Sequence, residues 1–512
     1  MAKKPIQYDE NGYRKFGMMD KLAYAAGDFG CNMSFALKGT VQTFWLVYMM
    51  METGLLSALL LVVQVWDAIN DPIIGALIDR DKGNYKNKFF SSLGKFKSYI
   101  FIGACGLLVA GALVFIPVPN ADVWLKAVLF ILGYVVWDAC YTFANVPYGS
   151  MLSLISEDSG ERAQLSTWRS VGSMVGNIFP MVLLPMLIWR KEVNADGTPL
   201  INPETGVQVE TLLGERVFWV ALIMGVLGFI AFIFMIKTAT IRVDENSVKA
   251  GEDVQKFNVV KAFGNFMKNR PAVGATVAAM GMFLGMQSAS TATTIMFATY
   301  FGMASLSGVV TLIGFLPMFL FMPFIKKIVN KYGKKECSVV GTLVSLVGGV
   351  IMFIFPVIPN KTVGLVIYLL GLVLFGIGMG VYTCVSWAMM GDAIDYNEWK
   401  FGSREEGTVY SLHSFFRKLA QGVGPSIVLL IMGALGYIEE LGTGGQSAQT
   451  AHNMCWLVAG LYMLSAVMQF VGIAFIYNLD KKTLDKMNND LSAKHGESKD
   501  AKEVVDSGVI GE

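Results

Sequence analysis

Long apolar stretches alternate with short polar loops along almost the whole chain. A helix needs about 20 apolar residues to cross the hydrocarbon core of a membrane, so each stretch predicts one transmembrane span. We therefore predict an all-α membrane protein. Its twelve spans lie near residues 21–49, 55–79, 99–117, 123–152, 166–189, 216–237, 272–300, 306–326, 337–357, 362–390, 408–437 and 452–477.

Composition and charge agree with this pattern. Hydrophobic residues make up 54% of the chain and charged residues 16%, whereas a soluble protein carries roughly 25% charged residues. Lysine and arginine gather in every second loop, as at 80–97 and 326–335, while the other loops carry few, at Arg190, Lys191 and Lys361. By the positive-inside rule, both termini are predicted to be cytoplasmic.

A polar stretch at 238–271 divides the spans into two blocks of six. A short basic loop follows the second span of each block, which indicates two pseudo-symmetric six-helix halves with a site between them. The predicted organisation is a cytoplasmic N-terminus at 1–20, an N-terminal half at 21–237, a cytoplasmic middle loop at 238–271, a C-terminal half at 272–477, and a cytoplasmic tail at 478–512 that we expect to be disordered. We interpret residues 191–215 as an ordinary external loop.

Two acids, Asp67 and Asp71, lie one helical turn apart inside the second span. An ionised acid in hydrocarbon costs at least a few kcal/mol, and adjacent acids repel each other. A cation that regularly lies between them would explain the pair. Asn70 shares their face, and Pro72 would free a backbone carbonyl, so the ligands are oxygens that suit Na⁺ or a proton. The alternative is a structural acid pair bound by arginines.

Other polar side chains recur at helical spacing in the first and fourth spans. They are Asp28, Asn32 and Lys38 in the first span, and Asp138, Tyr141 or Thr142, Asn145 and Gly149 in the fourth. An acid, an amide, a hydroxyl and an aromatic ring on one face suit a sugar. The alternatives are a structural acid–base pair, hydrogen bonding between helices only, and, for Lys38, a side chain that extends to the membrane surface.

Bases are embedded as well, at Arg169 in the fifth span and at His413, Arg417 and Lys418 in the eleventh. We expect Arg169 to pair with an acid in the fourth or the first span. The bases of the eleventh span need anions opposite them, and the first, second and fourth spans supply anions such as Asp138. This predicts a charge network between the halves that changes during alternating access.

Several motifs resemble the glycoside–pentoside–hexuronide:cation symporters, the branch of the major facilitator superfamily that includes the melibiose carrier. The similar segments are Asp67–Gly75 with Gly94–Lys97, Asn145–Ser150, Gly391–Lys400 with Arg404 and Glu406–Gly407, and Tyr410–Ser411 with Arg417–Lys418. The resemblance runs from about residue 20 to 480. It implies a major facilitator fold of twelve transmembrane helices.

The resemblance also implies roles for individual residues. The coupling cation would be bound by Asp67, Asn70, Asp71 and Thr142. Lys418 would couple the cation and sugar sites. The charge network predicted from the embedded bases comprises Asp138, His413, Arg417 and Lys418. The acids that bind galactosides in the melibiose carrier are replaced here by Asn32, Asn145 and Gly149. The pattern is more similar to the glucuronide and xyloside carriers, and the predicted substrate-binding residues are Asp28, Asn32, Lys38, Tyr141, Asn145, Arg169 and Lys418.

The sequence thus predicts a symporter of the bacterial cytoplasmic (inner) membrane, and not an enzyme. Driven by Na⁺ or H⁺, it would import a glucuronide, a xyloside or another oligosaccharide as a monomer in the lipid bilayer. We expect no cofactor, no metal other than Na⁺ and no nucleic-acid partner. One alternative is a non-sugar cargo such as a lysolipid. A remote alternative is a multi-span enzyme that uses Asp392, Asp395 and Glu398, but these acids lie among Lys400 and Arg404, in a loop to which the family gives a structural role. The chain has no P-loop motif, so we expect no P-loop ATPase to drive transport.

Overall fold

The computed structural model describes residues 12–81, 83–156, 158–243, 259–402 and 406–493. Among these residues, nine helices are long and apolar enough to cross a membrane, and Thr53–Asp67 and Ala304–Met318 are shorter apolar helical segments. The prediction of an all-α membrane protein is confirmed, and the count of twelve spans stays a prediction. Arg404 and much of the predicted middle loop lie outside the described residues.

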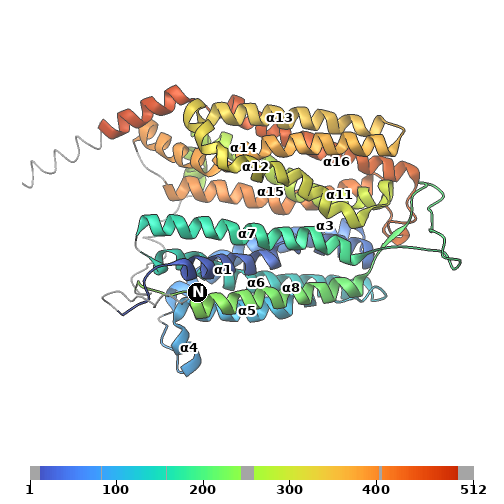
Figure 1. The fold of residues 1–512 in the computed structure, drawn as a ribbon, viewed down its shortest axis with the longest axis horizontal. Helices are drawn as coiled ribbons and strands as arrows, with labels where there is room; N and C mark the ends of the chain where they lie inside the picture. The colour runs from blue at the N-terminus through green and yellow to red at the C-terminus, as the bar shows by residue number, and fades with distance from the viewer. Residues whose placement is uncertain (1–11, 82, 157, 244–258, 403–405, 494–512) are drawn as a thin grey trace, which may run out of the picture. The chain divides into compact units, whose positions relative to one another are not determined.

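The first part of the chain contains eight α-helices and a β-hairpin among its described residues. They are α1 (Met18–Phe35), α2 (Lys38–Thr43), the π-helix η1 (Phe44–Tyr48), α3 (Thr53–Arg80), α4 (Lys88–Leu93), α5 (Lys95–Leu113), α6 (Val123–Ile155), α7 (Ser159–Ile188), β1 (Trp189–Lys191), β2 (Glu210–Leu212) and α8 (Gly214–Thr238). Figure 1 shows α5, α6 and α8 side by side, with the short α4 projecting beside them.

The remaining described helices follow in chain order. They are α9 (Val259–Lys268), α10 (Arg270–Phe283), η2 (Leu284–Ser288), α11 (Ala289–Met296), η3 (Phe297–Phe301), η4 (Ala304–Leu306), α12 (Ser307–Tyr332), α13 (Lys334–Ile354), η5 (Phe355–Val357), α14 (Lys361–Phe401), α15 (Glu406–Ala434), η6 (Glu439–Leu441), α16 (Ala448–Phe470) and η7 (Val471–Ile476).

Packing groups the described residues into two compact units. The first unit comprises the described parts of Met1–Val254 with Ser290–Leu312 and Pro425–Met454, and the second those of Gln255–Ala289, Ile313–Gly424 and Cys455–Glu512. These units differ from the two predicted halves. The reason is that residues 290–312 and 425–454, which belong to the C-terminal half by sequence, pack with the first six spans.

In the first unit, α1 packs against α7 and α8, and α5 packs against α6 and α8. Two glycines set the approach of α7 to α1. A methyl group at Gly172 would overlap the carbonyl oxygen of Ala25, and one at Gly176 would lie 2.9 Å from the carbonyl oxygen of Phe29. Small residues four apart let membrane helices approach closely. The sequence Gly172-x-x-x-Gly176 therefore brings the polar faces of α1 and α7 together.

The second unit is built around the long pair α13 and α14, with α10 packed against α14 and η7. Residues 481–493, in the tail that we expected to be disordered, form a further helix. Met487 is buried, and the Trp399 indole N–H donates to Asp490 at 3.0 Å. The tail was expected to lack structure because it is rich in charge, but its few apolar residues share one helical face.

The region from 189 to 212 also differs from the expected ordinary loop. Trp189, Arg190 and Lys191 pair antiparallel with Leu212, Thr211 and Glu210. Two isolated bridges, Val193 to Pro199 and Ile201 to Gln208, extend the hairpin. Apolar and polar residues alternate only over Val207-Gln208-Val209-Glu210, a run at the lower limit for a strand, so the sequence alone did not predict the hairpin.

We predict that Gly172→Ala destabilises the protein by about 1–3 kcal/mol, the usual cost of overpacking a close contact. Gly460→Ala in α16 is the matched control, because a methyl group there meets no atom within 4 Å. Thermal unfolding in detergent should show a lower midpoint for Gly172→Ala and no loss for the control. An unchanged midpoint for Gly172→Ala would contradict the close packing of α1 and α7.

Candidate functional site

A buried polar cluster joins α3, α6 and the start of α2. The Asn70 amide donates to the Asp138 carboxylate at 3.3 Å and to the Thr142 hydroxyl at 3.0 Å. The Lys38 ammonium lies 3.7 Å from the other Asp138 oxygen. Asp138 is only 1% exposed. Its negative charge therefore depends on Lys38 and Asn70, because an unpaired buried charge is costly.

Lys38 owes its position to an interruption of the first span. The helix α1 ends at Phe35, and α2 begins at Lys38 after two residues in a turn. The ammonium lies 5.3 Å from the centroid of the Phe35 ring and 6.0 Å from that of Tyr141. Aromatic faces attract cations at such distances. Lys38 therefore pairs with an acid on another helix.

Of the predicted cation ligands, the structure describes the side chains of Asp67, Asn70 and Thr142. Asn70 and Thr142 are in direct contact, and Asp67, one turn before Asn70 on α3, accepts a hydrogen bond from Gln64 at 3.3 Å. Asp71 follows on the same helix, but the structure does not describe the side chains of Asp71 and Pro72. The structure adds Asp138 to this neighbourhood. Carboxylate, amide and hydroxyl oxygens from α3 and α6 are thus gathered in one place.

A second polar network crosses from α7 to α1. The Arg169 Nε–H donates to Asp28 at 3.0 Å. The Asn32 amide donates to the same carboxylate at 3.1 Å, and the Asn177 amide donates to the Asn32 carbonyl oxygen at 2.7 Å. The Arg169 guanidinium also lies 5.1 Å from the centroid of the Tyr148 ring. We expected Arg169 to pair with an acid in the fourth or the first span. It pairs with Asp28, which lies in the first span.

This network is only partly closed to solvent. The Arg169 side chain is 39% exposed, whereas that of Asp28 is 7% exposed. A guanidinium carries five N–H donors in a fixed plane, so an arginine that uses Nε toward an internal acid keeps the geometry to bind a second anion or hydroxyl. Tyr141 and Asn145 are half-buried one turn apart on α6, and Gly149 follows on the same stripe.

The bases of the eleventh span belong to α15 and the second unit. The His413 Nδ1 lies 2.9 Å from the Thr276 hydroxyl. The Arg417 guanidinium lies 5.0 Å from the centroid of Trp387 and 5.5 Å from that of Phe283. Lys418, next in sequence, is half-buried. The anions predicted to face these bases belong to the first unit, so the charge network between halves stays a prediction.

Sequence reasoning missed Asn177 and the interruption at residues 36–37. Asn177 could have been found, because it follows Arg169 and Ser173 at intervals of four and so lies on the same face of α7. The interruption carries no proline or glycine at its two residues, Ala36 and Leu37, and the sequence gives no local signal for it.

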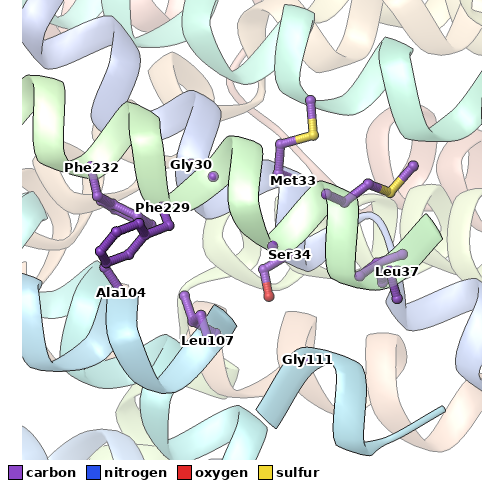
Figure 2. Close-up of a pocket in the computed structure, with 13 residues that line it drawn as sticks. Gly30, Met33, Ser34, Leu37, Ala104, Leu107, Gly111, Phe229 and Phe232 are labelled. Atoms are coloured by element: carbon purple, nitrogen blue, oxygen red, sulfur yellow. The ribbon is translucent and has the colours of Figure 1, made fainter. Parts of the chain in front are cut away.

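A small cavity in the first unit does not belong to the site. It lies between α1, α5 and α8, has a volume of about 10 Å³ and is lined mainly by apolar residues such as Met33, Leu107 and Phe232 (Figure 2). That is on the order of the space for one water. Its polar residue Ser34 already accepts a hydrogen bond from the Trp137 indole at 2.7 Å. The cavity is a packing defect, too small for a sugar.

Comparison with protein families identifies the chain. Residues 23–481 match the family described as MFS/sugar transport protein. This chain belongs to that family. The resemblance to the glycoside–pentoside–hexuronide branch and the major facilitator fold are therefore confirmed. Because it is a family of transporters, the protein is a membrane transporter and not an enzyme.

Curated relatives span nearly the whole chain. An uncharacterized symporter, YjmB of Bacillus subtilis (strain 168), is 28% identical, covering 94% of this chain and 96% of the relative. The isoprimeverose transporter of Lactiplantibacillus pentosus is 26% identical, covering 93% and 92%. The glucuronide carrier protein homolog of Escherichia coli (strain K12) is 26% identical, covering 90% and 93%.

The solved structure of nucleoside transporter NupG has the same fold. The two chains superpose with a TM-score of 0.55 at 15% sequence identity. The superposition covers 90% of this chain and 100% of NupG. At that level of identity the likeness concerns the fold alone.

We predict that Arg169→Met destabilises this transporter more than the double variant Asp28→Asn/Arg169→Met. The single change leaves a buried carboxylate without its partner, which costs about 3–5 kcal/mol in a fully buried pair and less here because Arg169 is partly exposed. Arg190→Met is the control, since the Arg190 side chain that pairs with Glu192 is 55% exposed. Thermal unfolding in detergent measures all three. A double variant less stable than Arg169→Met would contradict the pairing.

Proposed function

We propose that this transporter is a cation-coupled symporter that imports a glycoside, with Na⁺ or H⁺ as the coupling ion. The observation that carries the proposal is the contact of Asn70 with Asp138 and Thr142. Asp67 and Asp71 lie on the same helix as Asn70. Lys38 is paired with Asp138, and an acid in hydrocarbon is stable only when a positive charge compensates it, so we propose that a bound cation balances the acids of α3.

The glycoside would bind beside the second network. Asp28, Asn32 and Asn177 present amide and carboxylate groups, and the half-buried Tyr141 presents an aromatic face. Sugar hydroxyls need donors and acceptors together, and the apolar face of a sugar ring stacks on aromatic rings. Arg169, partly exposed, would hold the carboxylate of a hexuronide by paired N–H donors. The names of two relatives, a glucuronide carrier and an isoprimeverose transporter, support glycosides as cargo.

Lys38 would link the two sites. It pairs with Asp138 in the cation cluster and also faces Tyr141, next to the sugar residues. A cation bound near Asp138 would weaken the attraction of Lys38 to that acid, and the ammonium would then be free to bind a substrate carboxylate or hydroxyl. Lys418 remains the predicted coupling residue on the eleventh span. Binding of one ligand would thereby favour binding of the other.

We further propose that the protein lies in the bacterial inner membrane as a monomer, with both termini in the cytoplasm. The distribution of lysine and arginine over the loops supports this orientation.

The test is uptake of a panel of glycosides, including glucuronides and xylosides, into vesicles that carry an Na⁺ or an H⁺ gradient. Asp71→Cys should lower gradient-driven accumulation to the background level, because the cation site loses a carboxylate, while exchange of labelled for unlabelled glycoside continues. Asp196→Cys, on an exposed loop, should accumulate like the wild type. Undiminished accumulation by Asp71→Cys would contradict the cation site.

A further inference from the structure

The hairpin formed by residues 189–212, here called the strap, makes specific contacts with two segments that are far away in sequence. It connects α7 to α8 and extends past their ends (Figure 1). Its partners are residues 302–305, which precede α12, and residues 443–446, which precede α16. All three segments belong to the first compact unit, so their contacts are part of one packed structure.

Glu210 of the strap contacts both partner segments. Its carboxylate accepts hydrogen bonds from the Ser305 backbone N–H at 3.1 Å and from the Ser305 hydroxyl at 2.9 Å. Its backbone carbonyl accepts a hydrogen bond from the Thr443 hydroxyl at 2.9 Å. Glu210 is 1% exposed. A carboxylate this buried is stable only while such donors replace water.

Asn202, at the other end of the strap, reinforces the same attachment. Its amide donates to the backbone carbonyls of Gly444 at 2.7 Å and Gln446 at 3.2 Å. Gly302 has a positive φ of 66°, and a Cβ there would lie 2.8 Å from the Gln208 carbonyl oxygen. The partner segment thus reaches the strap through a position where only glycine fits easily.

These contacts are polar, and they join elements that move apart in a two-half transporter. The strap is continuous with spans of the N-terminal half, whereas both partner segments belong to the C-terminal half by sequence. In alternating access the halves rock against each other, and contacts at one end break when that end opens. Hydrogen bonds from Ser305, Thr443 and Asn202 can be exchanged for bonds to water, which suits a contact that must release.

Other contacts between the same halves lie near the strap and would open with it. The Ser57 hydroxyl on α3 donates to the Ser426 carbonyl at 2.9 Å, and the Thr53 backbone N–H donates to Glu439 at 2.6 Å. Ser57 is completely enclosed in this structure, with 1% exposure. The accessibility of residue 57 therefore reports whether this end is closed.

We propose that the strap holds this end of the transporter closed, with Glu210 as its central contact, and that it must detach before substrate can pass there. The inference rests on the proposed transport function. The positive-inside rule predicts that this end is external, since the strap joins the fifth and sixth spans on the side opposite the basic loops. The strap would then control entry of the glycoside from outside the cell.

The test is a disulfide that fastens the strap. A Cβ at Gly444 would lie 3.5 Å from the Cβ of Val209, within the range of about 3.5–4.5 Å found across disulfides. In purified Val209→Cys/Gly444→Cys/Ser57→Cys, maleimide labelling of residue 57, read by peptide mass spectrometry, should be at least tenfold slower in the oxidised than in the reduced form. Ser57→Cys alone, given the same oxidant, is the control and should not change.

Two outcomes would overturn the proposal. Failure of the disulfide to form under mild oxidation would contradict the contact between strap and partner. Equal labelling in the two forms would also overturn it, because this end would then open with the strap fastened or not open at all.

A second pair of variants isolates Glu210. Glu210→Gln, in the Ser57→Cys background, should raise the labelling rate several-fold, because the new amide N–H groups face the donors of Ser305. Glu192→Gln, in the strap beside the exposed Arg190, is the matched control and should leave the rate unchanged. Equal rates for the two variants would remove Glu210 from the proposed role.

Uptake measured on the same proteins separates this proposal from the proposed function. Equal labelling of the oxidised and reduced forms, together with intact glycoside uptake in the reduced form, would overturn only the proposal about the strap. A clear labelling difference in a protein that shows no cation-driven uptake in any form would support the strap and contradict the symport proposal.

Discussion

A charge surrounded by hydrocarbon must be matched by another charge or by hydrogen bonds, and this constraint organises the first unit around Asp138. Its carboxylate receives the Asn70 amide and lies 3.7 Å from the Lys38 ammonium. These groups come from three helices, so the pairing fixes α2, α3 and α6 together. The cost of a buried ion explains why so few charged residues occur in the spans and why those present are grouped.

The same constraint shapes the contact between α1 and α7. Arg169 and Asp28 can pair only because Gly172 and Gly176 let the two helices approach. Asn32 and Asn177 then complete a chain of hydrogen bonds along the interface. The close packing of small residues and the pairing of polar residues thus depend on each other. The helix α6 borders the Asp138 cluster through Thr142 and the Arg169–Asp28 network through Tyr141.

Much of the fold could be predicted from the sequence, because the lengths of the apolar stretches and the positions of the basic loops are visible along the chain without knowledge of tertiary contacts. The family could be identified because motifs such as Asp67–Gly75 are long and specific. The contact of Asn70 with Thr142 agrees with the set that the resemblance implied. The partner of Arg169 could not be chosen beforehand, since helical spacing gives the face of a helix but not the neighbour that this face meets. The attachment of the strap and the interruption before Lys38 depend on tertiary contacts, which local sequence patterns do not predict.

The proposed cation and glycoside sites share α6 and should therefore be thermodynamically linked. The most direct measurement is calorimetric titration of the purified transporter with a nitrophenyl glucuronide and a nitrophenyl xyloside, with and without Na⁺ and at two pH values. We predict that Na⁺ or H⁺ raises the affinity for one glycoside by about fivefold or more, and that the glycoside raises cation affinity by the same factor. Binding of a glycoside with an affinity that neither Na⁺ nor pH changes would contradict cation coupling.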